Sequence, residues 1–146
     1  YDSGSSLGFE KASELSTEAA IRYIPENLPD FVFLYLGIPD EAGHMYGWMS
    51  DAYMRAINRC WDMAEKVCSV LPEAYQVIFT TDHGGHGNVH GIDIPEDMII
   101  PFMASGSCFL GKGELTGVSI KDIAPTIVSI LGVPPDAEWE GKNLIS

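Results

Sequence analysis

The chain has 146 residues, of which 46% are hydrophobic and 20% charged, a composition that fits one globular domain over 1–146 and excludes a disordered chain. Its formal net charge of −13, from 21 acidic and 8 basic residues, argues against nucleic acid and anionic membrane as partners, because no excess of basic residues is available to meet phosphates. A small anionic substrate is still allowed, since bound divalent metal ions would reverse the local potential.

Apolar periodicity, N-capping residues and prolines divide the chain into alternating helices and strands. In the first half, we expect a loop over 1–8, a helix over 11–24 ended by Pro25 and Pro29, a strand over 31–36, a loop over 37–47 and a helix from the N-cap Ser50 to about Leu71. In the second half, we expect strands over 76–81 and 98–104, the latter with Pro101 at an edge or bulge. An irregular stretch over 111–118 and a helix over 120–131, with Ser119 and Asp122 as a capping box, are expected to follow. The runs 31–36 and 76–81 are unbroken stretches of β-forming apolar residues, which is typical of strands buried on both faces.

This alternation predicts an α/β fold whose sheet is largely parallel and covered by helices. Two polar clusters, within 37–47 and 80–91, directly follow two of the expected strands. Because ligands bind at the carboxyl ends of strands in open α/β sheets, both clusters are expected to contribute to a site.

The sequence gives only weak indications of the cellular location of the protein. The apolar runs are too short to span a bilayer, no signal peptide is visible at the start, and the three cysteines lack disulfide or metal-ligand spacing. We therefore expect a cytoplasmic protein with reduced thiols and no membrane partner.

All four histidines lie next to carboxylates in the two polar clusters. In the first cluster Asp40 and His44 are four residues apart, so one helical turn or a tight loop would aim both side chains at one point. The second cluster is rich in glycine and carries the remaining candidates, which are Asp82, His83, His86 and His90. Imidazole and carboxylate are ligands for zinc, manganese or iron, so a metal site is predicted. The alternative is a glycine-rich turn with hydrogen-bonded side chains, beside a loop with a surface histidine.

The order Asp-x-x-x-His, then Asp-His-Gly after a strand, then His-Gly, resembles the alkaline phosphatase superfamily. The likeness is to its type I phosphodiesterase/nucleotide pyrophosphatase and phosphonoacetate hydrolase branches, and it runs from about Phe31 to the C-terminus. Residues 94–102, 122–134 and 141–144 support it. The resemblance implies an alkaline phosphatase-like fold and two divalent metal ions, either zinc or, as the alternative, manganese.

Carried over residue by residue, the resemblance implies that Asp40, His44 and His90 hold one metal, and that Asp82 and His83 hold part of a second. In this superfamily the second ion also takes an aspartate and a nucleophilic serine or threonine from an N-terminal segment. This chain shows no match to that segment. We therefore expect the C-terminal portion of an alkaline phosphatase-like catalytic domain, with no nucleophile, an inactive isolated chain, a weak or empty second metal site, and apolar surface that favours self-association.

Other residues near the clusters receive simpler interpretations. His86 has no counterpart in the family pattern and is interpreted as a solvated or substrate-facing histidine. Tyr46 and Trp48 lie just after the first cluster and could line a pocket, but packing is the expected role, and Glu96 with Asp97 is expected to form a polar turn before a strand.

The function that the resemblance implies for the parent enzyme is metal-dependent hydrolysis of phosphate or phosphonate esters, with a small phosphorylated or phosphonate substrate. The first alternative is a metal-dependent phosphomutase of the same superfamily. The second is a non-catalytic relic that keeps the fold and acts by binding.

Overall fold

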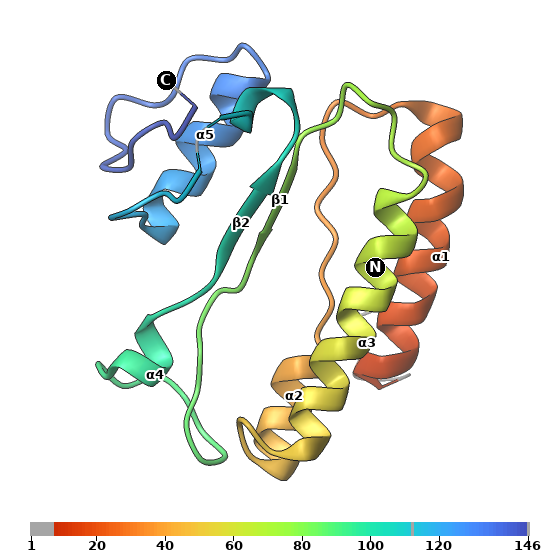
Figure 1. Cartoon of the computed structure of the whole chain (residues 1–146), viewed down its shortest axis with the longest axis vertical. Helices are drawn as coiled ribbons and strands as arrows, with labels where there is room; N and C mark the ends of the chain where they lie inside the picture. The colour runs from red at the N-terminus through yellow and green to blue at the C-terminus, as the bar shows by residue number, and fades with distance from the viewer. Residues whose placement is uncertain (1–7, 112, 146) are drawn as a thin grey trace. The chain divides into compact units, whose positions relative to one another are not determined.

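The computed structural model describes residues 8–111 and 113–145, and these fall into two compact units (Figure 1). The first unit contains the described residues up to Pro72 together with His83–Ile99, and the second contains Glu73–Asp82 and the residues from Ile100 onward. That the whole chain is a single domain stays a prediction. None of the helices in the described part of the chain is both long and apolar enough to cross a membrane.

The first unit is built from three helices and a short fourth one. Their bounds are α1 Phe9–Asn27, α2 Ile38–Tyr46, α3 Asp51–Cys68 and α4 Pro95–Met98. Helix α3 packs against both α1 and α2, and its N-terminus is capped by the Ser50 hydroxyl, which accepts a hydrogen bond from the Tyr53 amide at 3.2 Å. Arg59 on α3 forms ion pairs with Glu10 and Glu14 on α1, so the exposed edge of this helix pair is also held together.

The core of the first unit lies between α2 and α3. It contains Ile38 and Ala42 from α2 and Ala56 and Met63 from α3, with Cys60 packed against them. Burial raises the pKa of the Cys60 thiol to about 11, so this cysteine stays protonated at neutral pH. The side of α2 that faces α3 is thereby fixed, and the polar side of α2 is free to carry functional groups.

The second unit contains a two-stranded sheet and one longer helix. Its elements are β1 Val77–Thr80, β2 Phe102–Ser105, the 3₁₀ turns η1 Ser107–Phe109 and η2 Ile120–Asp122, and α5 Ile123–Ile130. Strands β1 and β2 are antiparallel, with Val77 opposite Ser105 and Thr80 opposite Phe102.

Asp122 ties the C-terminal segment to the start of α5. Its buried carboxylate accepts hydrogen bonds from the amides of Ser119 at 2.9 Å and Lys142 at 2.8 Å. Thr126 is fully buried and its hydroxyl accepts a bond from the Leu144 amide at 3.1 Å. These bonds replace the protein–water bonds that the tail would otherwise make.

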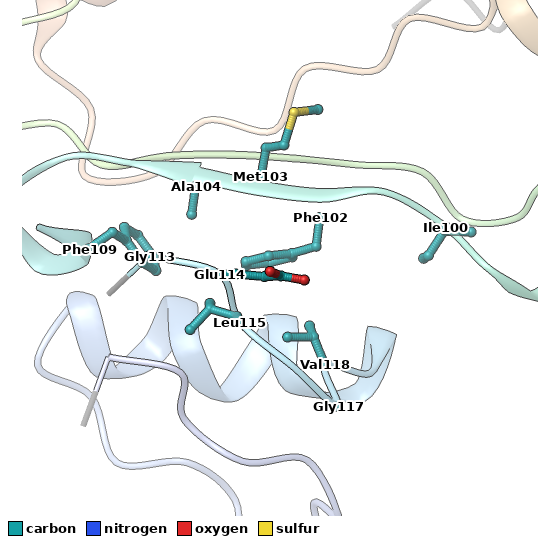
Figure 2. A pocket seen from close by; sticks show the side chains of 10 residues that line it. All are labelled: Ile100, Phe102, Met103, Ala104, Phe109, Gly113, Glu114, Leu115, Gly117 and Val118. Carbon is teal, nitrogen blue, oxygen red and sulfur yellow. The ribbon is translucent and has the colours of Figure 1, made fainter. Parts of the chain in front are cut away.

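A cavity of about 540 Å³ lies between β2 and the segment that precedes η2 (Figure 2). The residues that line it include Phe102, Leu115 and Val118, with Glu114 as a charged member. The lining residues do not include any of the predicted metal ligands. The residues that line this cavity therefore do not overlap with the two polar clusters.

Several predicted elements are confirmed. Helices form where 11–24, 51–71 and 120–131 predicted them, a strand forms within 76–81, and the capping box of Ser119 and Asp122 is present. Helix α1 runs past Pro25 to Asn27 and ends where Leu28 adopts the left-handed conformation, with φ of 48°. The third predicted strand begins later than expected, since Met98 still belongs to α4 and β2 starts at Phe102.

Three expectations need correction. The predicted strand over 31–36 is wrong, because this segment forms no ladder with other described residues and its side chains at Phe31 and Phe33 are exposed. The predicted loop over 37–47 is wrong as well: Pro39 lies in the first turn of α2, where its fixed φ and missing amide hydrogen suit a helix. The largely parallel sheet is not confirmed, since within the described residues β1 pairs with β2 in antiparallel orientation.

Replacing Asp122 by alanine is expected to destabilise the second unit by about 1–3 kcal/mol, because two amide donors lose their acceptor. The amide of Leu144 should then exchange faster with solvent, as measured by native-state hydrogen exchange. Asp136→Ala is the matched control, because this aspartate is exposed and its side chain accepts a local bond from the Glu138 amide. Equal loss of protection in the two variants would contradict the assignment.

Candidate metal centre

Helix α2 presents the first two candidate ligands on one face. Asp40 and His44 are one turn apart, and the Asp40 Oδ1 atom lies 3.5 Å from His44 Nε2. Asp40 is also in the first turn of α2, where the helix dipole favours a carboxylate. The local sequence thus fixes both the spacing and the charge of this pair.

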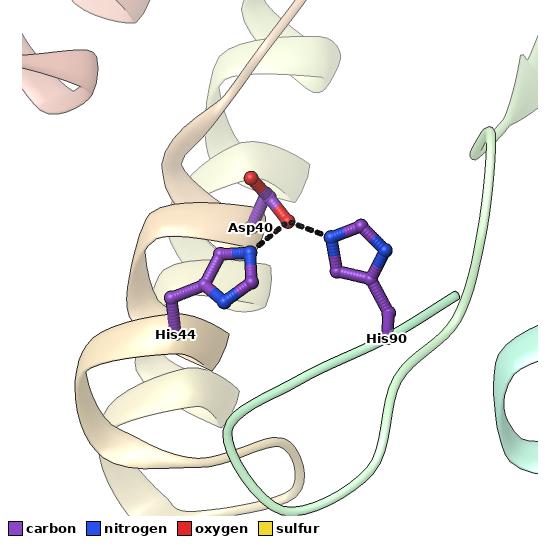
Figure 3. Close-up of side chains that lie close together, drawn as sticks. All are labelled: Asp40, His44 and His90. Carbon is purple, nitrogen blue, oxygen red and sulfur yellow. Dashed lines mark ion pairs between the residues drawn. The ribbon is translucent and has the colours of Figure 1, made fainter. Parts of the chain in front are cut away.

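The ligand loop, defined as residues 83–91, brings two more imidazoles to the same carboxylate. The Nε2 atoms of His83 and His90 each lie 3.7 Å from Asp40 Oδ1. Their rings stack with centroids 3.6 Å apart and planes within 12° of parallel. Figure 3 shows the Asp40 carboxylate between the rings of His44 and His90.

The tautomers of two histidines are set by carbonyl groups. His44 Nδ1 donates to the carbonyl of Asn88 at 3.0 Å, and His83 Nδ1 donates to the carbonyl of Gly84 at 2.7 Å. Because a carbonyl only accepts, each Nδ1 carries the proton, and in the neutral ring each Nε2 presents a lone pair towards Asp40.

These donors meet the requirements of a divalent cation. Asp40 Oδ1 is buried and has no hydrogen-bond partner, although lone pairs of imidazole nitrogens surround it. With neutral imidazoles such an arrangement is repulsive unless a cation lies among the atoms. The separations of 3.5 and 3.7 Å exceed ordinary hydrogen bonds and are close to the roughly 3.4 Å between ligand atoms of a tetrahedral zinc site.

The donor set that fits one ion is Asp40, His44 and His90. Their ligand atoms all lie within 4.8 Å of one another, and no other such group of three occurs among the described residues. His83 approaches the same carboxylate without belonging to this group. The residues therefore suit one ion with three protein ligands, next to a further imidazole.

Trp48 joins α2 to the ligand loop. Its ring lies edge-on to His44 and His90, with centroids 5.1 and 5.7 Å away. A Cβ atom added to Gly43 on α2 or to Gly85 in the ligand loop would lie 2.6 or 2.2 Å from the indole. Both positions therefore need glycine, since only a hydrogen fits beside the ring.

Asn88 makes a second connection between the two segments. Its side-chain amide donates to the carbonyls of His44 at 3.1 Å and Gly43 at 3.4 Å, near the end of α2. Helix-terminal carbonyls lack intrahelical partners, so this amide satisfies groups that otherwise need water. The Trp48 amide adds a bond to the Gly87 carbonyl at 2.7 Å.

Asp97 on α4 fastens both arms of the ligand loop. Its carboxylate is 2% exposed and accepts bonds from His86 Nδ1 at 2.7 Å and from the Ile92 amide at 3.0 Å. Burial raises the pKa of this carboxyl, but the hydrogen bonds from Ile92 and His86 outweigh it, and the pKa lies below its usual range. Asp97 is therefore ionised at neutral pH.

The structure brings Asp40, His44, His83 and His90 together, and their role as metal ligands stays a prediction. Asp82 belongs to the second unit, and its assignment to a second metal stays a prediction too.

His86 faces Asp97, so one of its ring nitrogens is already engaged, and its contact with a substrate stays a prediction. One prediction about the surroundings of the centre is wrong. Glu96 and Asp97 lie on the short helix α4, and Asp97 is buried, so the expected polar turn was wrong. No sequence pattern predicted the roles of Asp97 and Asn88, because both side chains bond to groups that only the folded loop brings close to them.

Comparisons with known proteins identify a family and several relatives of this chain. Residues 7–99 match the family model described as type I phosphodiesterase / nucleotide pyrophosphatase. A 2,3-bisphosphoglycerate-independent phosphoglycerate mutase 2 from Methanosarcina acetivorans is 28% identical, over 88% of this chain and 25% of the relative. Enzymes named 2,3-bisphosphoglycerate-independent phosphoglycerate mutase from Clostridium perfringens and Moorella thermoacetica are 26% and 24% identical, over 89% and 99% of this chain and 26% and 28% of the relatives.

The chain thus spans about a quarter of the length of the curated relatives that it matches. No solved structure matches it significantly.

Gly85→Ala is expected to destabilise the first unit by about 1–3 kcal/mol, because the new methyl group would overlap the Trp48 indole. Urea unfolding followed by circular dichroism measures this change. The control is the same substitution in a Trp48→Ala background, where the overlap is removed and the penalty should largely disappear. Simple additivity of the two substitutions would show that the indole does not restrict this position.

Proposed function

The chain belongs to the type I phosphodiesterase/nucleotide pyrophosphatase family of the alkaline phosphatase superfamily, and we propose that it supplies a divalent metal site to an enzyme of phosphoryl transfer. The observation that carries the proposal is the buried Asp40 Oδ1 atom, which lacks a hydrogen-bond partner and is surrounded by imidazole nitrogens. The family and the relatives' names support phosphoryl transfer as the reaction class.

Asp40, His44 and His90 are the residues that we propose hold the first ion. When bound, such an ion acts as a Lewis acid that stabilises negative charge on the oxygens of a phosphoryl group. The protein's part is to orient the donors: the Asn88 carbonyl fixes the tautomer of His44, and the Trp48 ring limits the movement of His90. Nitrogen and oxygen donors suit zinc, and manganese is the alternative.

A second ion held in part by Asp82 and His83 belongs to the same proposal. His83 lies next to the first set of donors, with its Nε2 atom 3.7 Å from Asp40 Oδ1. Paired ions in phosphoryl-transfer enzymes lie about 4 Å apart and stabilise both the attacking and the leaving oxygens. The position of His83 beside Asp40 is consistent with such a pair.

The relatives' names favour a phosphomutase, in which phosphate moves between hydroxyl groups of a small phosphorylated substrate. The family description favours the second candidate, hydrolysis of phosphate or phosphonate esters. Both use the same donors, so they differ in the acceptor of the phosphoryl group and not in the metal site. Substrate contact by His86, a cytoplasmic location and self-association stay predictions.

Metal binding by the chain is the first test. After chelator treatment, calorimetric titration with Zn²⁺ or Mn²⁺ should show one ion per chain, and Asp40→Asn should weaken binding on the order of a hundredfold or more, since even outer-shell partners are typically worth about 10–100-fold. Asp62→Asn is the matched control, because Asp62 is exposed on α3. Equal affinities for Asp40→Asn and the wild-type chain would refute the proposed site.

The reaction is tested on the full product of the gene. We expect that incubation with a phosphoglycerate and Mn²⁺ or Zn²⁺ yields a new phosphate ester in ³¹P NMR spectra, without matching release of inorganic phosphate. Release of inorganic phosphate from this substrate or from an aryl phosphate ester would instead establish the hydrolase. If the protein binds metal but forms neither a new phosphate ester nor inorganic phosphate, the result would support a non-catalytic protein that acts by binding.

A further inference from the structure

We propose that Asp97 and His86 are positioning residues that hold the ligand loop in the geometry needed for metal binding, without contacting the ion. This inference rests on the metal centre of the proposed function. It concerns two residues that lie outside the donor set of Asp40, His44 and His90.

The contacts of α4 fix the ligand loop and the residue that follows it. On one arm, the amides of Gly84 and Gly85 donate to the carbonyls of Asp97 and Glu96, both at 2.8 Å. A Cβ atom at Gly84 would lie 2.1 Å from the Glu96 carbonyl oxygen, so this close approach requires glycine.

The Asp97 side chain extends the same attachment. One carboxylate oxygen accepts from His86, and the other accepts from the Ile92 amide just beyond the loop. Between these points the amides and carbonyls of His86 and Val89 bond to each other at 3.0 Å and close the turn.

The two imidazoles at the metal centre lie immediately next to these fixed points. His83 directly precedes Gly84, and His90 directly follows Val89 and lies two residues before Ile92. A metal site tolerates little error in ligand position, so backbone restraint on both sides of the loop affects the site more than a typical surface contact does. The restraint reaches the donor set through His90, and through Asn88 of the loop, whose carbonyl accepts a hydrogen bond from His44.

The chemistry of the contact between Asp97 and His86 fits this positioning role. Asp97 is 2% exposed, and a buried carboxylate is costly unless donors satisfy it. Both of its oxygens receive donors, and each donor comes from a different arm of the loop. Loss of either donor leaves a buried charge partly unsatisfied and releases one arm, so the two arms depend on each other through this carboxylate.

The experiment compares four forms of the 146-residue chain: wild type, His86→Ala, His86→Asn and Asp97→Asn. The variant His86→Asn keeps an N–H donor near the position of the imidazole Nδ1, whereas His86→Ala removes it. Glu96→Gln serves as a control on the same helix, because the Glu96 side chain is exposed and only its backbone carbonyl contacts the loop. Urea unfolding in the presence of chelator first establishes that each variant folds without metal.

Titration with Zn²⁺ then measures affinity, and the visible absorption of bound Co²⁺ reports the ligand geometry. We expect His86→Ala and Asp97→Asn to weaken Zn²⁺ binding by roughly tenfold and to alter the Co²⁺ spectrum, as outer-shell partners typically do. His86→Asn should recover most of the affinity, and Glu96→Gln should match the wild-type chain. If the contact between Asp97 and His86 only adds stability, the substitutions would lower the unfolding midpoint and leave the Zn²⁺ affinity and the Co²⁺ spectrum of the folded variants unchanged. That result would overturn the inference.

A second readout needs no metal. In the chelator-treated chain, His86→Ala should shift the NMR signals of the His83 and His90 ring protons, because these stacked rings lose their alignment. Unchanged ring signals would refute the positioning role even if the variant were less stable. If the wild-type chain binds no divalent ion but the ring signals move, the proposed function fails while the positioning of the two rings stands.

Discussion

The crowding of imidazole nitrogens around one buried carboxylate oxygen is the constraint that the contacts of the first unit have to satisfy. Asp40 Oδ1 has no hydrogen-bond donor, and the Nε2 atoms of His44, His83 and His90 lie 3.5 to 3.7 Å away. When their rings are neutral, His44 and His83 present lone pairs to this carboxylate and repel it, so the fold must hold them in place against that repulsion. Helix packing and loop contacts supply this restraint, and a cation would convert the repulsion into attraction.

The restraint comes from contacts on three sides. Helix α3 packs against the apolar side of α2, which leaves Asp40 and His44 on the other side. Trp48 fills the space between Gly43 and Gly85, and Asn88 ties the ligand loop to the end of α2. On the remaining side, Asp97 attaches the loop to α4. These contacts restrain the ligand loop, and such restraint lowers the entropy cost of ordering the loop when a ligand binds.

The parts of this arrangement that could be predicted from sequence are those that depend on near neighbours. The four-residue spacing of Asp40 and His44, the Ser50 cap and the capping box of Ser119 and Asp122 are local, and the structure shows them. A strand depends on a partner elsewhere in the chain, so the apolar run over 31–36 was a poor guide to pairing. The buried role of Asp97 arises from the Ile92 amide and the His86 imidazole, which meet it only after the loop has folded, and no spacing rule could reveal it.

The composition of the donor set also bears on how so acidic a chain could bind the phosphorylated substrate that we propose. With a net charge of −13, the protein as a whole repels anions, and a site built mainly from carboxylates would add to that repulsion. The proposed first site uses one carboxylate and two imidazoles, which are uncharged when they bind a metal. A divalent ion held by this set keeps one net positive charge, and Debye screening limits the opposing effect of distant carboxylates to within about 10 Å. The choice of histidine over further aspartate therefore suits a substrate that carries negative charge.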